Sequence, residues 1–177
     1  MKCVVNDEKI DILLSTYNGS KYIAELLDSI LNQTYQNWRI LVRDDGSTDT
    51  TMEIVQKYKN KYPEKFEILD NHNLNLRPSK SFEALLKYSN ADYIMFCDQD
   101  DYWLETKIEL TYNHMLEKER LHGKDTPILI HTDLFVTDSE LNVINDSFMN
   151  YQKLNPNEKS FNKLLVQNNV TGCTVMI

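Results

Sequence analysis

The chain has few glycines, prolines and cysteines, and it has no long apolar run. Four glycines and four prolines among 177 residues exclude collagen-like and Gly/Pro-rich disordered classes. The three cysteines, Cys3, Cys97 and Cys173, are odd in number and far apart, which predicts reduced thiols rather than a disulfide framework or a zinc site. No apolar run approaches the roughly 20 residues that cross a bilayer, and the first residues lack the apolar core of a signal peptide. We therefore expect a cytoplasmic protein with no membrane segment in this chain.

Positive charge is also scarce. The chain has 19 lysines and arginines against 27 aspartates and glutamates, a formal net charge of −8. This balance argues against a general nucleic-acid surface, so we expect no nucleic-acid partner. A phosphate-bearing ligand would have to be held by a metal ion or by local backbone groups. The 41% hydrophobic and 26% charged residues are typical of a globular protein with a core of its own.

Short apolar runs alternate with segments of helical period. Strands are expected at 10–15, 38–42, 66–69, 93–97 and 128–131. Between them, apolar residues recur at helical spacing in 23–31, 54–58, 79–89 and 108–115. This alternation predicts an α/β fold, a Rossmann-like and mainly parallel sheet with helices on both faces. We expect one domain over residues 1–177.

An acidic cluster closes one of the apolar runs. Asp98-Gln99-Asp100 is followed at once by Asp101, directly after the strand expected at 93–97. In open α/β sheets the carboxyl ends of the strands are where ligands bind. Like charges a few ångströms apart repel by roughly 4 kcal/mol at an effective dielectric near 20, and hard divalent cations prefer such oxygen ligands. The pattern predicts a cation site, with a solvated acidic loop as the alternative.

Two further strands end in polar residues. Ser15-Thr16-Tyr17-Asn18 follows the first strand, and Asp44-Asp45-Gly46-Ser47 follows the second. If these strands are neighbours of the one that ends at Asp98, one pocket would hold hydroxyls, an amide, an aromatic ring and several carboxylates. The alternative for both segments is an ordinary turn followed by a helix cap.

Several motifs, in this order, resemble glycosyltransferase family 2. They are Leu-Ser-Thr-Tyr-Asn-Gly at 14–19, Ile-Leu-Asn-Gln-Thr-Tyr at 30–35 and Arg-Asp-Asp-Gly-Ser-Thr-Asp at 43–49. The segment at 93–103, which contains the acidic cluster, resembles the bacterial rhamnosyltransferase-like subgroup, and 168–174 resembles that subgroup's acceptor-side loop. The resemblance covers about residues 10–177.

This resemblance implies a GT-A fold and a specific activity. The family transfers a sugar from a nucleotide-diphosphate-sugar donor, here a UDP- or TDP-sugar, to a hydroxyl of a saccharide or lipid-linked acceptor. The matching subgroup implies an inverting, metal-dependent enzyme of cell-surface polysaccharide synthesis, in the cytoplasm or at the inner face of the membrane. The sequence leaves the donor sugar, the linkage and the oligomeric state open.

The resemblance also assigns the donor site. Thr16, Tyr17 and Asn18 match the segment that wraps the nucleotide base, where the ring of Tyr17 can stack. Asp44 matches the carboxylate that accepts a hydrogen bond from a uracil-type N–H, and Asp45 is expected to point away, since neighbours in an extended segment face opposite sides.

Cations near this edge are Arg77 and Lys80. The resemblance makes Lys80 a candidate phosphate contact, with a solvated lysine at the start of a helix as the alternative.

For the metal site, the resemblance implies Asp100 as the direct ligand of Mn²⁺ or Mg²⁺. Asp98 is expected to contact the donor ribose or to hold the metal through water. Asp101 can equally cap the helix that follows.

The acceptor side is assigned to Trp103, Thr171 and Gly172, with core packing equally open for Trp103. After Gly172 the chain offers no residue that can act as a base, so we expect the catalytic base beyond Ile177 and a domain truncated at its C-terminal end. A non-catalytic nucleotide-sugar-binding module and a sugar nucleotidyltransferase are the alternatives. A nucleotidyltransferase usually begins with a Gly-rich phosphate loop, whereas the loop after the first expected strand in this chain has one glycine.

Overall fold

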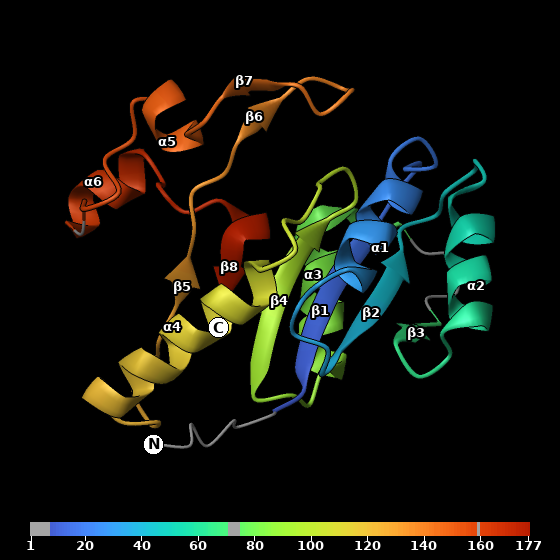
Figure 1. The fold of residues 1–177 in the computed structure, drawn as a ribbon, viewed down its shortest axis with the longest axis horizontal. Helices are drawn as coiled ribbons and strands as arrows, with labels where there is room; N and C mark the ends of the chain where they lie inside the picture. Colours follow the sequence, from blue (N-terminus) through green and yellow to red (C-terminus); the bar gives the residue numbers. More distant parts are fainter. Residues whose placement is uncertain (1–7, 71–74, 159) are drawn as a thin grey trace.

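The computed structural model describes residues 8–70, 75–158 and 160–177. Their main sheet has the strand order β3-β2-β1-β4-β8-β5 (Figure 1). Its strands are β1 (Ile10–Thr16), β2 (Trp38–Asp44), β3 (Phe66–Ile68), β4 (Tyr93–Asp98), β5 (Ile130–His131) and β8 (Val175–Met176). The first four are parallel to one another, and β8 runs antiparallel to both β4 and β5. The prediction of a mainly parallel α/β sheet is confirmed.

Helices cover both faces of this sheet (Figure 1). On one face α1 (Ile23–Leu31), α2 (Thr51–Lys61) and α4 (Lys107–His122) contribute to the larger hydrophobic core. On the other face α3 (Arg77–Tyr88) packs Leu85 against Leu13 and Leu41. The apolar stripe expected on α1 is the face that is buried.

The remaining elements are short. They are β6 (Val136–Thr137), β7 (Val143–Asn145), α5 (Phe148–Tyr151), α6 (Phe161–Val166) and the 3₁₀ turn η1 (Gly172–Thr174). The strands β6 and β7 pair with each other in a separate two-stranded sheet. In Figure 1, β6, β7, α5 and α6 lie beyond the upper edge of the main sheet. Among the described residues, every helix is too short or too polar to span a bilayer.

The strand register sets the geometry of the predicted ligand edge. Parallel pairing aligns Thr16 of β1 with Asp44 of β2, and Ser15 of β1 with Asp98 of β4. Because β2, β1 and β4 are neighbours, the three polar loops that follow them meet at one edge of the sheet. This arrangement was predicted from the sequence and is confirmed.

The start of α3 differs from the expectation. The helix begins at Arg77 rather than at 79. Pro78 lies in its first turn, where proline is tolerated because backbone N–H groups there have no acceptor within the helix. Arg77 itself has φ +64°, in the left-handed region that non-glycine residues rarely adopt. Its backbone is held there by a carboxylate from another element, which is described below.

The motif at 30–35 has a packing function. Gln33 is buried, and its amide accepts a hydrogen bond from Ile108 N (3.0 Å) and donates one to Leu104 O (2.8 Å). The hydroxyl of Ser29 accepts from Trp103 N at 3.0 Å. Helix α1 therefore holds the segment that follows the acidic cluster, and Trp103 is 1% exposed within the core. Of the two roles expected for Trp103, the structure shows packing.

Candidate functional site

A cavity of about 380 Å³ opens at the carboxyl edge of the sheet. It is lined by the end of β1 and the residue after it, by Asp45 after β2, by the start of α3 and the segment before it, and by the end of β4 with the acidic loop. The lining residues are Ser15, Thr16, Tyr17, Asp45, Asn75, Arg77, Pro78, Phe82, Asp98, Gln99 and Asp100. The site predicted from the three loops therefore exists as one space, with a fourth wall from α3.

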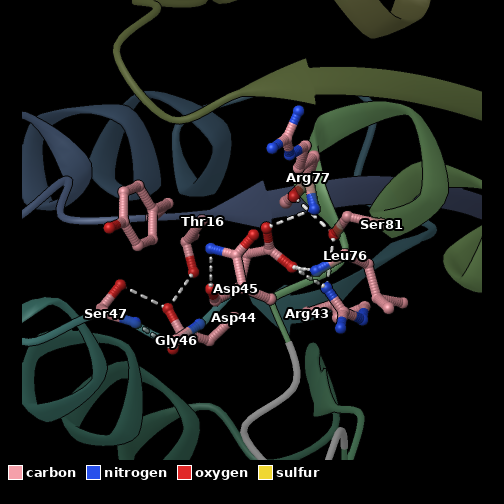
Figure 2. Close-up of polar contacts among 12 residues, drawn as sticks. Thr16, Arg43, Asp44, Asp45, Gly46, Ser47, Leu76, Arg77 and Ser81 are labelled. Atoms are coloured by element: carbon pink, nitrogen blue, oxygen red, sulfur yellow. Dashed lines mark hydrogen bonds and ion pairs between the residues drawn. The ribbon is translucent and has the colours of Figure 1, made fainter.

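A buried ion pair builds that fourth wall (Figure 2). Arg43 and Asp45 lie 2.6 Å apart, with side chains only 3% and 5% exposed. The two Asp45 carboxylate oxygens also accept the backbone N–H groups of Leu76 (2.6 Å) and Arg77 (2.8 Å). Arg43 donates further to the hydroxyl of Ser81 on α3 at 3.0 Å. The carboxylate thus acts as a cap for α3 that comes from the end of β2.

The electrostatics of Asp45 follow from these contacts. Burial alone would raise the pKa of its carboxyl, but the hydrogen bonds from Arg43, Leu76 and Arg77 outweigh it and the pKa is lowered. Asp45 is therefore ionised at neutral pH and lines the cavity. The expectation that Asp45 points away is wrong, because this side chain is needed to hold the start of α3.

Asp44 is turned into its own loop instead (Figure 2). Its Oδ1 accepts from Thr16 Oγ1 (2.9 Å) and from Ser47 Oγ (2.5 Å), and its Oδ2 accepts from Gly46 N (3.1 Å) and Ser47 N (2.8 Å). A carboxylate has about four acceptor sites, and these contacts use that many. Asp44 is 7% exposed and is not among the described residues that line the cavity. Its predicted contact with the base stays a prediction.

Residues 16–18, at the end of β1 and just after it, comprise one exposed aromatic ring and two side chains that hold the loops together. Tyr17 is 50% exposed and lines the cavity, which suits a ring that stacks on a base. Thr16 is buried against Asp44. Asn18, with φ +49°, accepts the N–H of Thr48 on its side-chain oxygen at 2.8 Å and so ties this loop to the one after β2.

A group of possible metal ligands lies at the end of β4. One carboxylate oxygen each of Asp98 and Asp101 and the Sγ of Cys173 lie within 4.8 Å of one another. Burial, followed by repulsion from Asp101 and Asp100, raises the pKa of Asp98, whose carboxylate is partly desolvated although the residue as a whole is exposed. The pKa of Asp101 is also raised by burial, and its buried Oδ2 accepts no hydrogen bond from the described residues. The two carboxylates of this group fit a divalent cation, because such an ion would relieve their repulsion and satisfy the unpaired oxygen of Asp101.

The acceptor-side loop meets this acidic group. Cys173 is 6% exposed in η1, and burial raises the pKa of its thiol well above the usual range. Lys107 Nζ donates to the Cys173 carbonyl at 2.9 Å, which fixes η1 against α4. The neighbouring Thr171 is half-buried and Gly172 is exposed. The sequence alone did not suggest Cys173 as part of this group.

Two cations near the cavity differ in position. Arg77 lines it, whereas Lys80 is exposed and is not among the described lining residues. Of these two cations, Arg77 is therefore the one that lines the cavity. Sequence reasoning placed both near the donor edge, but it could not show which of the two the turn into α3 would direct at the cavity.

Comparison with known proteins agrees with this geometry. The family model described as Glycosyl transferase family 2 matches residues 11–167. The chain belongs to glycosyl transferase family 2. Among solved structures, this family 2 chain resembles "Crystal structure of S. aureus TarS 1-349 in complex with UDP", with a TM-score of 0.56 and 27% identity. That likeness covers 81% of this chain and 44% of the other, and it shows that the fold is GT-A.

Curated relatives extend the comparison. This family 2 chain is 32% identical over 130 residues to the "UDP-Glc:alpha-D-GlcNAc-diphosphoundecaprenol beta-1,3-glucosyltransferase WfaP" of Escherichia coli, covering 73% of this chain and 50% of that protein. It is 39% identical over 99 residues to the "dTDP-rhamnosyl transferase RfbG" of Shigella flexneri, covering 54% and 34% respectively. The chain thus spans half or less of the length of these two relatives.

The ion pair leads to a prediction about pH. In Asp45→Asn, buried Arg43 loses the carboxylate that lies 2.6 Å from it, so the free energy of unfolding at pH 7 should fall by about 3 kcal/mol. Because the folded pKa of Asp45 lies below its ordinary 3.8, the charge stabilises the fold above that value. That stabilisation is lost as the pH falls through the folded pKa, so the difference between the two proteins should begin to shrink below about pH 3.8. Urea unfolding from pH 7 to pH 3 measures this, with exposed Asp125→Asn as the control, and a constant gap would contradict it.

The contacts of Asp44 lead to a second prediction. Asp44→Ala leaves two backbone N–H groups and two hydroxyls without their acceptor, so the free energy of unfolding should fall by about 2–3 kcal/mol. Asp44→Asn keeps one acceptor oxygen and should lose less. Thermal unfolding without ligand measures both variants. An unchanged midpoint in Asp44→Ala would show that the carboxylate does not support this loop.

Proposed function

We propose that this chain binds a nucleotide-diphosphate sugar and belongs to an inverting, metal-dependent glycosyltransferase of cell-surface polysaccharide synthesis. The observation that carries the proposal is the cavity at the carboxyl edge of a family 2 domain, where Tyr17, Arg77 and the Asp98–Asp100 segment face one space. An exposed aromatic ring suits a base, and a guanidinium suits a phosphate oxygen. The carboxylates beyond them suit a metal-bound diphosphate.

The donor is a UDP- or TDP-sugar in this proposal. Support comes from the UDP in the TarS complex and from the UDP-Glc and dTDP-rhamnosyl donors in the names of WfaP and RfbG. A lipid-linked saccharide as acceptor is supported by the diphosphoundecaprenol in the name of WfaP. Such an acceptor would place the enzyme at the inner face of the membrane. A TDP-rhamnose donor, as in the name of RfbG, falls within this proposed class of UDP- and TDP-sugars.

Mn²⁺ or Mg²⁺ is the proposed cofactor. Asp100 and Asp98 are its proposed ligands. Both line the cavity, and a carboxylate oxygen of Asp101 lies within 4.8 Å of one of Asp98, whereas Asp100 is not in that close group. When bound, the cation would act as a Lewis acid on the leaving diphosphate. The described residues would hold the nucleotide, orient the sugar toward η1 and keep the acceptor loop, Thr171 and Gly172, beside it.

An inverting transfer also requires a base. A carboxylate takes the proton from the acceptor hydroxyl as its oxygen attacks the anomeric carbon, and the nucleoside diphosphate leaves. We propose that this base lies beyond Ile177. If the base lay within the chain instead, Asp101 and Asp133 would be the carboxylates to examine first. Burial raises the pKa of Asp101, as suits a general base. Burial would also raise the pKa of Asp133, but hydrogen bonds from Ser147 and three backbone N–H groups lower it overall.

A nucleotide-sugar-binding module without catalysis remains the second candidate, because the donor pocket alone does not require a base. A panel of UDP-, TDP- and GDP-sugars in a thermal-shift assay, with and without Mn²⁺, tests the donor class. Because the proposed base lies beyond Ile177, single-turnover sugar transfer by this chain beside a C-terminally extended version then separates the two candidates. Donor stabilisation with no transfer by the extended version would favour the binding module, and stabilisation by none of the donors would overturn the proposal.

The metal assignment leads to a third prediction. Asp100→Asn should abolish the part of UDP affinity that depends on Mn²⁺ and leave the fold intact or slightly more stable, because one of several repelling carboxylates is neutralised. Isothermal titration with UDP at saturating Mn²⁺ measures the loss. Asp92→Asn, an exposed aspartate just before β4, is the matched control. UDP affinity equal to wild type in Asp100→Asn would reject Asp100 as a ligand.

A further inference from the structure

Gln99 makes a two-point contact with the backbone of Tyr17. Its side-chain Oε1 accepts the N–H of Tyr17 at 2.8 Å, and its Nε2 donates to the carbonyl of Tyr17 at 3.0 Å. The two residues are 82 positions apart in the chain and follow neighbouring strands. The side-chain amide therefore pairs with a backbone amide as a neighbouring strand would.

This contact is specific to a carboxamide. The two bonds require one acceptor and one donor at the end of one side chain, which glutamine supplies. Both bonds also fix the orientation of the amide, because the reversed amide would put donor against donor and acceptor against acceptor. A glutamate would keep the bond to Tyr17 N and place its second oxygen against the Tyr17 carbonyl.

Gly19 provides the space that Gln99 occupies. A Cβ at Gly19 would lie 2.4 Å from Gln99 Oε1 and 2.6 Å from its Cδ, closer than real Cβ contacts. The backbone at Gly19 is itself held, since its N–H donates to Thr51 Oγ1 at 2.8 Å. The glycines with positive φ among the described residues are Gly46 and Gly123. Gly19 thus leaves room for the end of the Gln99 side chain, and it is not among the glycines with positive φ.

The contact joins the two halves of the proposed donor site. Tyr17 lies on the side assigned to the base, and Gln99 lies between Asp98 and Asp100 on the side assigned to the diphosphate. We propose that Gln99 is a positioning residue, which uses the space at Gly19 to hold the Tyr17 segment at a fixed distance from the acidic loop. The inference rests on the proposed function, because it says which ligand this spacing serves, a nucleoside diphosphate.

The first test needs no ligand. Gly19→Ala should lower the unfolding midpoint by about 3 °C or more, because the new methyl group displaces Gln99. In a Gln99→Ala background the same change should have little effect, since the clashing atoms are gone. A double-mutant cycle of thermal unfolding measures this difference. If Gly19→Ala lowered the unfolding midpoint equally in both backgrounds, the proposed use of the space at Gly19 by Gln99 would be wrong.

The second test separates positioning from general loss of structure. Gln99→Ala should weaken UDP about tenfold, or about 1.4 kcal/mol, because the ring of Tyr17 is no longer held against the base. Binding of pyrophosphate with Mn²⁺ should change less than about twofold, since Asp98 and Asp100 remain. Gln56→Ala, on the exposed face of α2, controls for the loss of a glutamine elsewhere.

Each outcome of the titrations has one meaning. Unchanged UDP affinity in Gln99→Ala would overturn the positioning role, and an equal loss for UDP and pyrophosphate would assign Gln99 to the metal side instead. Failure of the wild-type chain to bind UDP would overturn the proposed UDP donor. The unfolding cycle would then decide the contact between Gly19 and Gln99 on its own.

Discussion

The buried ion pair between Arg43 and Asp45 is the interaction on which the candidate site depends most. An isolated buried charge is highly unfavourable, so each partner requires the other to stay in place. Asp45 then has oxygens left for the backbone N–H groups of Leu76 and Arg77. One pair of side chains thereby fixes the end of β2, the start of α3 and the cavity wall between them.

The strained start of α3 is a consequence of that pair. A positive φ at an arginine is unfavourable by about 1–2 kcal/mol and persists only where the surroundings hold it. At Arg77 the Asp45 carboxylate takes the backbone N–H, and the adjacent N–H of Leu76 goes to the same group. The turn brings the arginine to the cavity, whereas Lys80, three residues later on the helix, is not among the described lining residues. The position of the cation is therefore set by backbone geometry and not by its order in the sequence.

Contacts between distant segments complete the site in the same way. Gln33, which follows α1, holds the chain after the acidic loop, and Lys107 holds η1 against α4. The result is that Cys173, 72 residues after Asp101, lies beside the acidic group. Burial of these polar groups accounts for the raised pKa values of Asp98 and Asp101, and it is the physical reason that a cation suits this place.

The fold was predictable from the sequence because its signals are local. Apolar runs and the helical stripe of α1 depend on near neighbours, and the right-handed crossover rule converts them into a parallel sheet. The loops after β1, β2 and β4 were predicted to meet, and they do. The motifs at 14–19, 30–35, 43–49 and 93–103 together indicated the family, whose model matches residues 11–167.

What the sequence could not decide is the direction of individual side chains within those loops. The family resemblance placed Asp44 in the site, and alternation along an extended segment then suggested that Asp45 points away from it. In the folded chain Asp44 satisfies its own turn and Asp45 faces the cavity. The deciding partners of Asp45 include Leu76 and Arg77, 31 and 32 residues later. The sequence by itself determined which elements form and which edge they share, since those depend on short-range periodicity. Only the tertiary structure decided which carboxylate lines the cavity, because a buried charge must face its partners and these come from elsewhere in the chain.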